Sequence, residues 1–361
     1  MPTKLPEELF DPHHHFIDTD GNSFQSFLKS CAGSLLYTPE EYEKDVKDSL
    51  ASVGVKLSGS VHVEAMPDDG AEESAWVQDL ITSGRCTTVK AIVGSVDLAS
   101  PNAATDMAKL KSSSPLVRGV RWILDCAGPF DDGKTATHVA TKRHDGIDYL
   151  RGGREDGTIG GYDGSIVPAF EAGFAKLADH ELSFDLQCAP SQLLKAAELF
   201  KKYPNIPVVI DHLGKPRMVL GEDDPNNKNT IPDAEEIRVW RAGMNAMAAL
   251  PHVFVKISML GYAIPGWIRT SEREAVMKGL VRETIELFGP QRCMVATNWW
   301  ANAAMSDADG LSKVGPDAVC LCEKFVSFFD GYSNVDLQRL FSGTAKCFYR
   351  ISSSGDLEKS P

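Results

Sequence analysis

Three consecutive histidines, His13 to His15, follow an apolar lead-in near the start of the chain. Because side chains of an extended strand alternate between its two faces, His13 and His15 are expected to point the same way and His14 the opposite way. Two imidazoles about 6–7 Å apart on one strand face suit the chelation of one divalent ion or the clamping of an anionic substrate. A solvated turn is the structural alternative, but the flanking apolar residues favour a strand.

Further polar residues stand at the ends of other apolar runs that we interpret as strands. They are Glu64, Arg121, Gln187, His212 and Asn298, with Lys215 shortly after His212 and with Trp299 and Trp300 after Asn298. Each of them alone could be an ordinary structural residue, and the two tryptophans could belong to the core. Three histidines that converge on one end of a barrel, together with nearby cations, are harder to explain as structural residues.

The elements that must position these residues alternate between apolar runs and helical patterns. We expect strands at about residues 10–17, 55–66, 89–98, 117–124, 182–188, 207–212, 253–257 and 292–297. Helices are expected at about 39–53, 72–83, 103–110, 167–179, 191–202, 235–249, 272–288, 316–329 and 335–347. Such alternation predicts an α/β protein with a parallel sheet, and eight repeats favour a (β/α)8 barrel over an open sheet.

The whole chain, residues 1–361, is expected to form one barrel domain with a core at about 8–350. Two polar segments, at about 126–166 and 214–234, interrupt the alternation and are expected to be long loops after strands. No glycine-rich dinucleotide or P-loop motif follows a strand. Since barrel enzymes carry their chemistry at the carboxyl ends of the strands, the polar strand-end residues should meet there.

Composition limits the partners of the protein. The chain has 43% apolar and 24% charged residues, which is typical of a globular protein, and its formal net charge of −13 argues against nucleic acid or an anionic membrane as a partner. No apolar run reaches the length of a membrane span, and the N-terminal residues lack a signal-peptide core. Eight scattered cysteines indicate reduced thiols, so we expect a cytoplasmic location. The sequence is compatible with a homo-oligomer.

Several motifs resemble one superfamily. Asp11-Pro12-His13-His14-His15 and the string from Asp211 to Pro216, Asp-His-Leu-Gly-Lys-Pro, look like the amidohydrolase superfamily, and more narrowly its group of sugar lactonases and 2-pyrone-4,6-dicarboxylate lactonase. The runs at 61–65, 118–121 and 184–187 are similar to that group in the same order. The resemblance covers about residues 8–350 and implies a distorted (β/α)8 barrel. It implies His13, His15 and His212 as metal ligands or substrate clamps, and Arg121 and Lys215 as groups that hold a carboxylate or polarise a carbonyl.

The chain departs from this group at the eighth strand. The group usually ends that strand in Ser-Asp-Trp-Pro, whose aspartate activates water, whereas this chain has Asn298 followed by Trp299 and Trp300. An amide cannot take up a proton at neutral pH, so the usual base is absent. Three histidines, with Glu64 as a further candidate, would hold a zinc-like ion with one open position. The dicarboxylate lactonase branch implies a metal-free site, so both forms stay open.

Three functions are consistent with these residues. The first is a hydrolase that opens a lactone or related cyclic ester, in which the histidines and Lys215 polarise the carbonyl and Arg121 binds an acidic or hydroxylated substituent. In this hypothesis Glu64, Gln187, Trp299 and Trp300 contact the substrate. The second is a metal-dependent, non-oxidative decarboxylase, because related barrels use the same histidines. The third is a non-catalytic binding protein for small molecules, which the loss of the usual aspartate makes conceivable.

Overall fold

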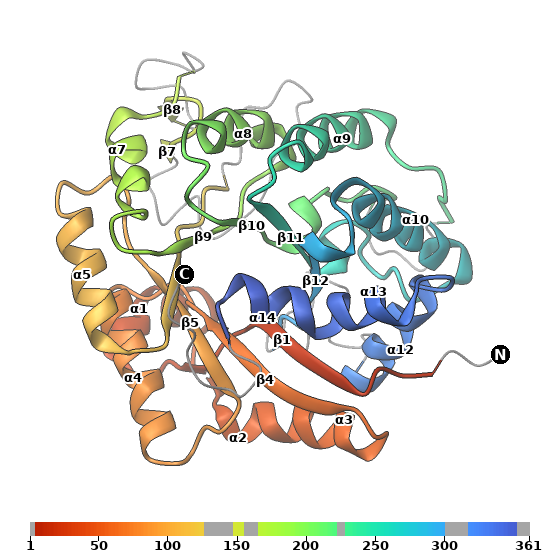
Figure 1. Cartoon of the computed structure of the whole chain (residues 1–361), viewed down its shortest axis with the longest axis horizontal. Helices are drawn as coiled ribbons and strands as arrows, with labels where there is room; N and C mark the ends of the chain where they lie inside the picture. The colour runs from red at the N-terminus through yellow and green to blue at the C-terminus, as the bar shows by residue number, and fades with distance from the viewer. Residues whose placement is uncertain (1–3, 126–146, 155–164, 222–227, 300–316, 352–361) are drawn as a thin grey trace.

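A sheet of eight parallel strands forms the centre of the molecule (Figure 1). The computed structural model describes residues 4–125, 147–154, 165–221, 228–299 and 317–351. Neighbouring strands pair in the order of the sequence, and they are β1 Glu8–His14, β4 Lys56–Val63, β5 Val89–Ser95, β6 Val117–Arg121, β9 Ser183–Leu186, β10 Val208–Ile210, β11 Val253–Ile257 and β12 Cys293–Val295. Strands of this length buried on both faces explain the continuous apolar runs of the sequence.

The sheet is nearly closed into a barrel by the segment that follows β12. The Asn298 backbone N–H donates to the carbonyl oxygen of His13 at 2.8 Å, and the His15 N–H donates to the carbonyl of Trp299 at 3.2 Å. An isolated parallel bridge joins His14 to Trp299. The expected distorted (β/α)8 barrel is therefore confirmed, with its seam between the first and the last strand.

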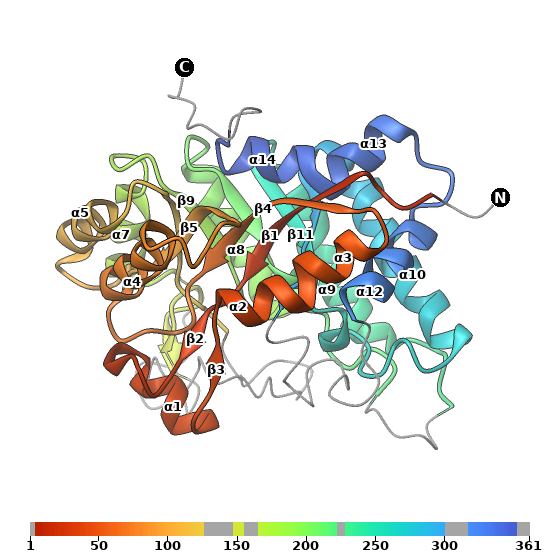
Figure 2. The same cartoon turned by 90° about the horizontal axis from the view of Figure 1, so that it is seen from below.

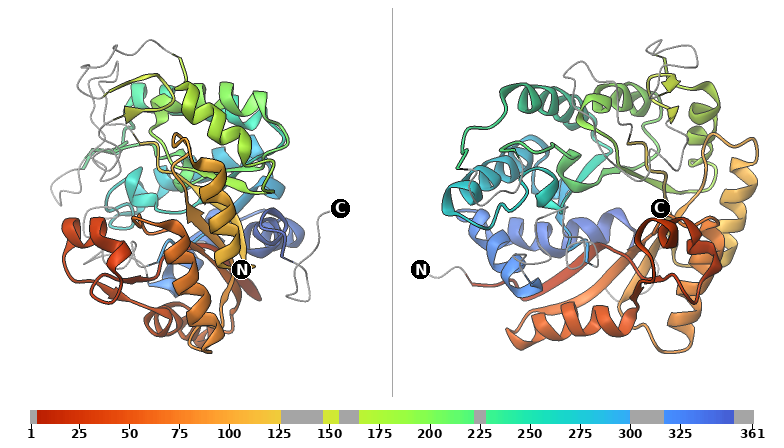
Figure 3. Two further views of the ribbon diagram at one scale, coloured as in Figure 1. Left: turned by 90° about the vertical axis from the view of Figure 1, so that its left-hand side faces the viewer. Right: turned by 180° about the vertical axis from the view of Figure 1, so that it is seen from behind.

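Helices surround this sheet on its outside, as the two views of Figure 3 show. They are α1 Ser26–Ala32, α2 Pro39–Tyr42, α3 Ser49–Ser52, α4 Gly70–Thr82, α5 Ala103–Ser113, α7 Pro168–Lys176, α8 Leu193–Lys202, α9 Ala234–Ala248, α10 Ser271–Phe288, α12 Ala318–Phe328, α13 Asn334–Gln338 and α14 Thr344–Phe348. Two π-helical turns, Glu43–Asp48 and Arg339–Gly343, join α2 to α3 and α13 to α14. Within the described residues, no helix has the length and apolar character needed to cross a membrane.

Local sequence signals account for where several helices begin. Thr38 and Glu41 form a capping box ahead of α2, and the side chains of Asp69, Asp233 and Thr270 accept backbone N–H groups at the starts of α4, α9 and α10. Acidic residues in the first turns add a favourable interaction with the helix dipole. The predicted helices are thus confirmed to within a few residues.

The expected strands, except the one at 253–257, were too long at their carboxyl ends. The run expected to end at residue 212 pairs only through Val208–Ile210, and the run expected to reach residue 66 stops at Val63. His212 and Met66 have φ values of 55° and 54°, which a strand cannot contain. The chain therefore turns sharply at the residues that the sequence marks as polar strand ends.

Smaller elements connect the barrel strands. Two short antiparallel pairs join β2 Ile17–Asp18 to β3 Leu36–Tyr37 and β7 Ile147–Asp148 to β8 Gly153–Arg154. Short 3-10 helices span Ser23–Gln25, Pro190–Gln192, His212–Gly214, Leu260–Tyr262 and Pro290–Arg292. Of the two insertions expected at 126–166 and 214–234, residues 126–146, 155–164 and 222–227 lie outside the described residues.

Two apolar cores hold the barrel. The larger lies between the sheet and the surrounding helices. The smaller comprises Phe10, Val61, Val63, Ala91, Val93, Val209, Met294, Ala345, Phe348 and Tyr349. Its last three residues belong to α14 and the residue after it, at the end of the barrel opposite to α1, β2 and β3 (Figure 2). This end of the barrel interior is therefore filled with apolar side chains, and the polar strand ends lie towards the other.

Candidate active site

The first strand places its histidines on alternate faces as predicted. His13 and His15 lie on one side with ring centroids 5.0 Å apart. His14 lies on the other side, where its ring stacks on Tyr42 at 4.2 Å and its Nε2 is 3.0 Å from Ser60 Oγ. His13 and His15 are both buried. His14 therefore serves packing between the sheet and the helices, while the other two histidines face the inside of the barrel.

The polar residues that follow β10 lie in a tight turn with left-handed backbone conformation. His212, Leu213 and Lys215 have φ values of 55°, 58° and 50°, and the indole N–H of Trp240 donates to the Leu213 carbonyl at 2.8 Å. A Cβ on Gly214, whose φ is 70°, would lie 2.7 Å from the Met244 sulfur. Glycine at position 214 is thus needed for the sharp turn that presents His212.

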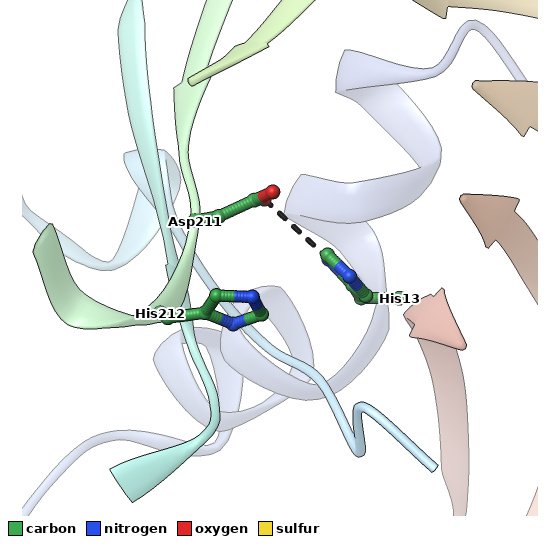
Figure 4. A group of neighbouring side chains, drawn as sticks. All are labelled: His13, Asp211 and His212. Carbon is green, nitrogen blue, oxygen red and sulfur yellow. Dashed lines mark ion pairs between the residues drawn. The ribbon is translucent and has the colours of Figure 1, made fainter. Parts of the chain in front are cut away.

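His13, Asp211 and His212 form one compact group (Figure 4). Each of them offers a ligand atom, and these atoms lie within 4.8 Å of one another. The Asp211 carboxylate is 3.4 Å from His13 Nδ1, and the rings of His13 and His212 are 4.8 Å apart between centroids. Asp211, which the sequence reasoning quoted only as part of a motif, is therefore a member of the group, and its place directly after a strand was the available signal.

His15 is outside this three-residue group. Its Nδ1 is 2.8 Å from the carbonyl oxygen of Val63, at the end of β4. This contact fixes the orientation of the ring next to His13. Its expected role as a ligand or clamp stays a prediction.

Arg121, at the end of β6, is held in place by Glu64. Its Nε donates to Glu64 Oε1 at 2.7 Å and its Nη2 donates to the Glu64 carbonyl. Its Nη1 lies 3.3 Å from Gln187 Oε1 and 3.6 Å from Asp211 Oδ2. Glu64, expected to contact substrate or metal, is thus the residue that orients Arg121, and both side chains are buried.

Lys215 is paired with a carboxylate that the sequence reasoning missed. Its Nζ lies 2.6 Å from Asp125 Oδ2 and 4.6 Å from the centre of the Tyr262 ring. Gln187 Nε2 donates to the same Asp125 oxygen at 3.1 Å. Lys215, Asp125, Gln187 and Arg121 therefore form a continuous polar row across the carboxyl ends of the strands.

Asn298 and Trp299 lie at the seam of the barrel. Asn298 is buried with a left-handed φ of 49°, its Nδ2 is 2.9 Å from the sulfur of Met259, and its Oδ1 has no partner among the described residues. Trp299 is also buried, next to His14 in the barrel seam. Trp300 lies outside the described residues.

A family model described as Amidohydrolase matches residues 10–351. The chain belongs to the amidohydrolase family. It is 27% identical over 316 residues to an L-fucono-1,5-lactonase of Burkholderia ambifaria, with 87% of each chain covered. As a member of this family with a lactonase among its relatives, the protein is an enzyme of the hydrolase class.

Two solved structures show the same barrel as this amidohydrolase. The crystal structure of an amidohydrolase from Burkholderia multivorans with bound zinc has a TM-score of 0.61 at 20% identity and covers 94% of this chain and 98% of that chain. A putative 2-pyrone-4,6-dicarboxylic acid hydrolase from Pseudomonas putida has a TM-score of 0.58 at 16% identity and covers 98% and 100% of the two chains. At such identities the likeness concerns the fold.

The histidines of this amidohydrolase are kept neutral by their surroundings. Burial lowers the pKa of His13 and of His212 well below the usual range, and the ammonium of Lys256 lowers that of His13 further. Burial and Arg121 lower the pKa of His15 to about 3. Near pH 7 these imidazoles are therefore unprotonated, which is the form that accepts a proton or ligates a metal.

The donor set suits a divalent metal of the zinc type. Two imidazoles and a carboxylate with ligand atoms this close are the ligands that zinc takes, and three protein ligands leave a position open. Burial acts to raise the pKa of Asp211, but the charges of Lys256 and Arg121 outweigh it, so its pKa lies below the usual range and the carboxylate is charged. By donor type, His13, Asp211 and His212 therefore fit such an ion.

The same buried histidines should make the metal-free protein unstable in mild acid. The folded protein keeps His13, His14, His15 and His212 neutral because burial lowers their pKa values, whereas the unfolded chain protonates its histidines below about pH 6.5. Below that pH each histidine should remove up to about 1.4 kcal/mol of unfolding free energy per pH unit. Asp185, whose pKa burial and Asp211 raise to about 6, offsets part of this loss by binding a proton in the folded state.

Urea unfolding of the metal-free protein at pH 7.5, 6.5 and 5.5 measures this effect. We expect the unfolding free energy to fall with each step and the slope to steepen below pH 6.5. His14→Gln, which removes a buried histidine outside the group of His13, Asp211 and His212, should reduce the slope by about one proton. A stability that is constant between pH 7.5 and 5.5 would contradict this prediction, because it would mean that the folded and unfolded states take up protons equally over this range.

Proposed function

We propose that this amidohydrolase is a lactonase that opens a cyclic ester by adding water to its carbonyl carbon. The observation that carries the proposal is the meeting of two neutral, buried imidazoles, His13 and His212, with a charged Asp211 at the carboxyl ends of the barrel strands. Ester hydrolysis needs a proton acceptor for water and donors for the oxyanion, and both kinds of group lie here. The lactonase relative from Burkholderia ambifaria supports the same reaction class.

The residues would share the reaction as follows. His212, whose Nδ1 lies 3.0 Å from Ser258 Oγ, takes a proton from water as the water oxygen bonds to the carbonyl carbon. N–H groups of Arg121 and Lys215 stabilise the resulting oxyanion. When the intermediate collapses, the ring C–O bond breaks and the protonated His212 returns the proton to the leaving alkoxide. The product is a hydroxy acid, which ionises.

If a divalent ion were held by His13, Asp211 and His212, it would supply Lewis-acid polarisation of the ester carbonyl, and the lone pair of His212 Nε2 would then be a ligand in place of the proton acceptor. Asp211 is charged in this site, and Arg121 is oriented by Glu64. Asn298 adds a buried amide that can contact a substrate oxygen.

The charge balance of the site favours an uncharged substrate. Among the described residues, Arg121 holds Glu64 and Lys215 holds Asp125, each at 2.6–2.7 Å. A substrate carboxylate would have to compete with these buried ion pairs, whereas lactone hydroxyls need only hydrogen bonds. We therefore propose a hydroxylated lactone, such as the 1,5-lactone of a sugar acid, in preference to a pyrone dicarboxylate.

A substrate panel tests this proposal. Neutral sugar-acid 1,5-lactones, 2-pyrone-4,6-dicarboxylate and dihydroxybenzoates are offered at pH 7 with and without added zinc, and acid release, ring opening and carbon dioxide are recorded separately. We expect turnover of neutral lactones above the rate of spontaneous hydrolysis. Carbon dioxide from a dihydroxybenzoate would favour the decarboxylase hypothesis instead, and saturable binding without turnover would favour a binding protein.

A further inference from the structure

A lysine is buried inside the barrel, below the site described above. Lys256 lies on β11, and its side chain has no exposed surface. Barrel interiors are normally filled with branched apolar side chains, and a buried charge costs free energy unless its partners are well placed. A lysine at this depth is therefore expected to serve something other than packing.

The ammonium group of Lys256 lies close to three acceptor atoms. Lys256 Nζ lies 2.5 Å from Asp185 Oδ2, 3.0 Å from Asp211 Oδ1 and 3.1 Å from His13 Nδ1. An ammonium group has three donors and cannot accept. The ammonium is therefore hydrogen-bonded to Asp185 and His13 and paired with Asp211 by charge, and His13 and Asp211 are members of the proposed catalytic group.

Lys256 is in turn held in place by residues at the end of the barrel interior that is filled with apolar side chains. The hydroxyl of Tyr349 donates to Asp185 Oδ2 at 2.9 Å, and Lys256 Nζ lies 5.6 Å from the centre of the Tyr349 ring. Tyr349 follows α14 and belongs to the small apolar core inside the barrel. A line of contacts therefore runs from this core through Asp185 and Lys256 to His13.

We propose that Lys256 is a positioning residue that fixes the tautomer of His13 and the orientation of Asp211, and that Asp185 and Tyr349 hold it in place. Each ring nitrogen of His13 faces a cation that can only donate, since Lys256 Nζ lies 3.1 Å from Nδ1 and Arg121 Nη1 lies 3.4 Å from Nε2. A neutral imidazole has one acceptor nitrogen, and the shorter contact assigns it to Nδ1, which leaves the ring proton of the metal-free protein on Nε2. The competing arrangement, in which His13 Nδ1–H donates to Asp211 Oδ1, has the longer distance of 3.4 Å.

The consequence is a division of roles between the two histidines. His13 with its proton on Nε2 is a donor towards the site. His212 can donate from Nδ1 to Ser258 Oγ, which leaves its Nε2 unprotonated as the acceptor. Lys256 thereby makes His212 the base of the pair. This effect on catalysis rests on the proposed lactonase function, whereas the tautomer of His13 does not.

The tautomer is measured directly by two-bond proton–nitrogen correlation NMR of protein labelled with ¹⁵N-histidine and freed of metal with a chelator. The His13 signal is assigned through its loss in His13→Asn. We expect a protonated Nε2 and an unprotonated Nδ1 in the native protein at pH 7. In the double variant Lys256→Met/Asp185→Asn, which removes one charge of each sign, we expect the proton to move to Nδ1. A native signal with the proton on Nδ1 would overturn the proposal, whatever the substrate.

Kinetics on a lactone that the protein turns over test the positioning role. The double variant should lose about 100-fold in kcat with little change in KM, because a misplaced catalytic group affects mainly the transition state. Tyr349→Phe, the milder change, should lose roughly fivefold in kcat. Tyr203→Phe is the matched control, since its hydroxyl contacts Glu171 at the surface and its kcat should not change.

Each outcome of these measurements either supports or contradicts the positioning role of Lys256. If the double variant does not fold, the kcat of Tyr349→Phe and the tautomer of His13 in the native protein test the positioning role of Lys256 on their own. A folded double variant or a Tyr349→Phe protein with native kcat and a lower melting temperature would show that Lys256 only supports the fold. Partial recovery of kcat by Lys256→Arg would support the proposal, because arginine still presents donors to both partners.

Discussion

His212→Asn is expected to lower kcat/KM on a turned-over lactone by about 10³-fold, because general-base catalysis contributes about 10²–10⁴-fold and no other neutral imidazole has the same position. Asparagine retains polarity at the site but cannot take up a proton near pH 7. The melting temperature should change little. His212 lies after the last paired residue of β10, and the left-handed turn that presents it is held by the Trp240–Leu213 hydrogen bond.

His252→Asn is the control for this variant. His252 stands just before β11, at the opposite end of the strands, and is only partly buried. Steady-state rates and thermal unfolding of the two variants are measured side by side, with zinc content determined for each. If His212→Asn keeps more than about a tenth of the native kcat/KM, His212 is not the base.

The barrel could be predicted from the sequence because its signals are local. Strands such as Val208–Ile210 are continuous apolar runs, and helices such as Ser271–Phe288 begin at a recognisable cap. Strand ends were predicted less well. Backbone conformation at residues such as His212 depends on a left-handed turn that Trp240, on a distant helix, stabilises.

The site was only partly predictable for a related reason. The residues at the strand ends were found because a barrel brings its carboxyl ends together. Which side chains pair with one another could not be deduced from the sequence, because the partners are far apart in the chain. Asp125 and Lys215 are separated by 90 positions, and Lys256 and His13 by 243. In the sequence Lys256 is one polar residue within an apolar strand, and its partners Asp185, Asp211 and His13 come from distant parts of the chain.

Asn298 is the residue at which the chain departs from the lactonase group that it resembles, and the contacts of its side chain indicate its role. It has a left-handed φ of 49°, a conformation that asparagine and aspartate tolerate better than most residues. Its backbone N–H closes the barrel onto the His13 carbonyl at 2.8 Å. Its Oδ1 is buried without a partner among the described residues, so a ligand hydroxyl or water would supply one. An isosteric Asn298→Asp change therefore alters charge with little effect on the backbone.

Asn298→Asp is expected to lower kcat/KM by about 5–150-fold, which corresponds to roughly 1–3 kcal/mol of transition-state stabilisation. Glu64, Asp125 and Asp211 already place carboxylates around the site, and Asn298 Oδ1 is buried without a hydrogen-bond donor among the described residues, so a new charge there would be poorly compensated. The amide donor is lost as well. Steady-state rates from pH 5 to 9 for the native protein and the variant measure the effect.

Asn245→Asp on α9 is the control for this change, because the same new charge lies there at the exposed surface and should leave kcat/KM unaltered. The opposite result for Asn298→Asp would be a rise in kcat/KM with a new acidic limb in the pH profile, since the added carboxylate would then act as the base that the resemblance implies. Asn298 would in that case be an attenuating replacement. A fall with an unchanged profile instead makes its amide part of the native mechanism, in which His212 takes the proton.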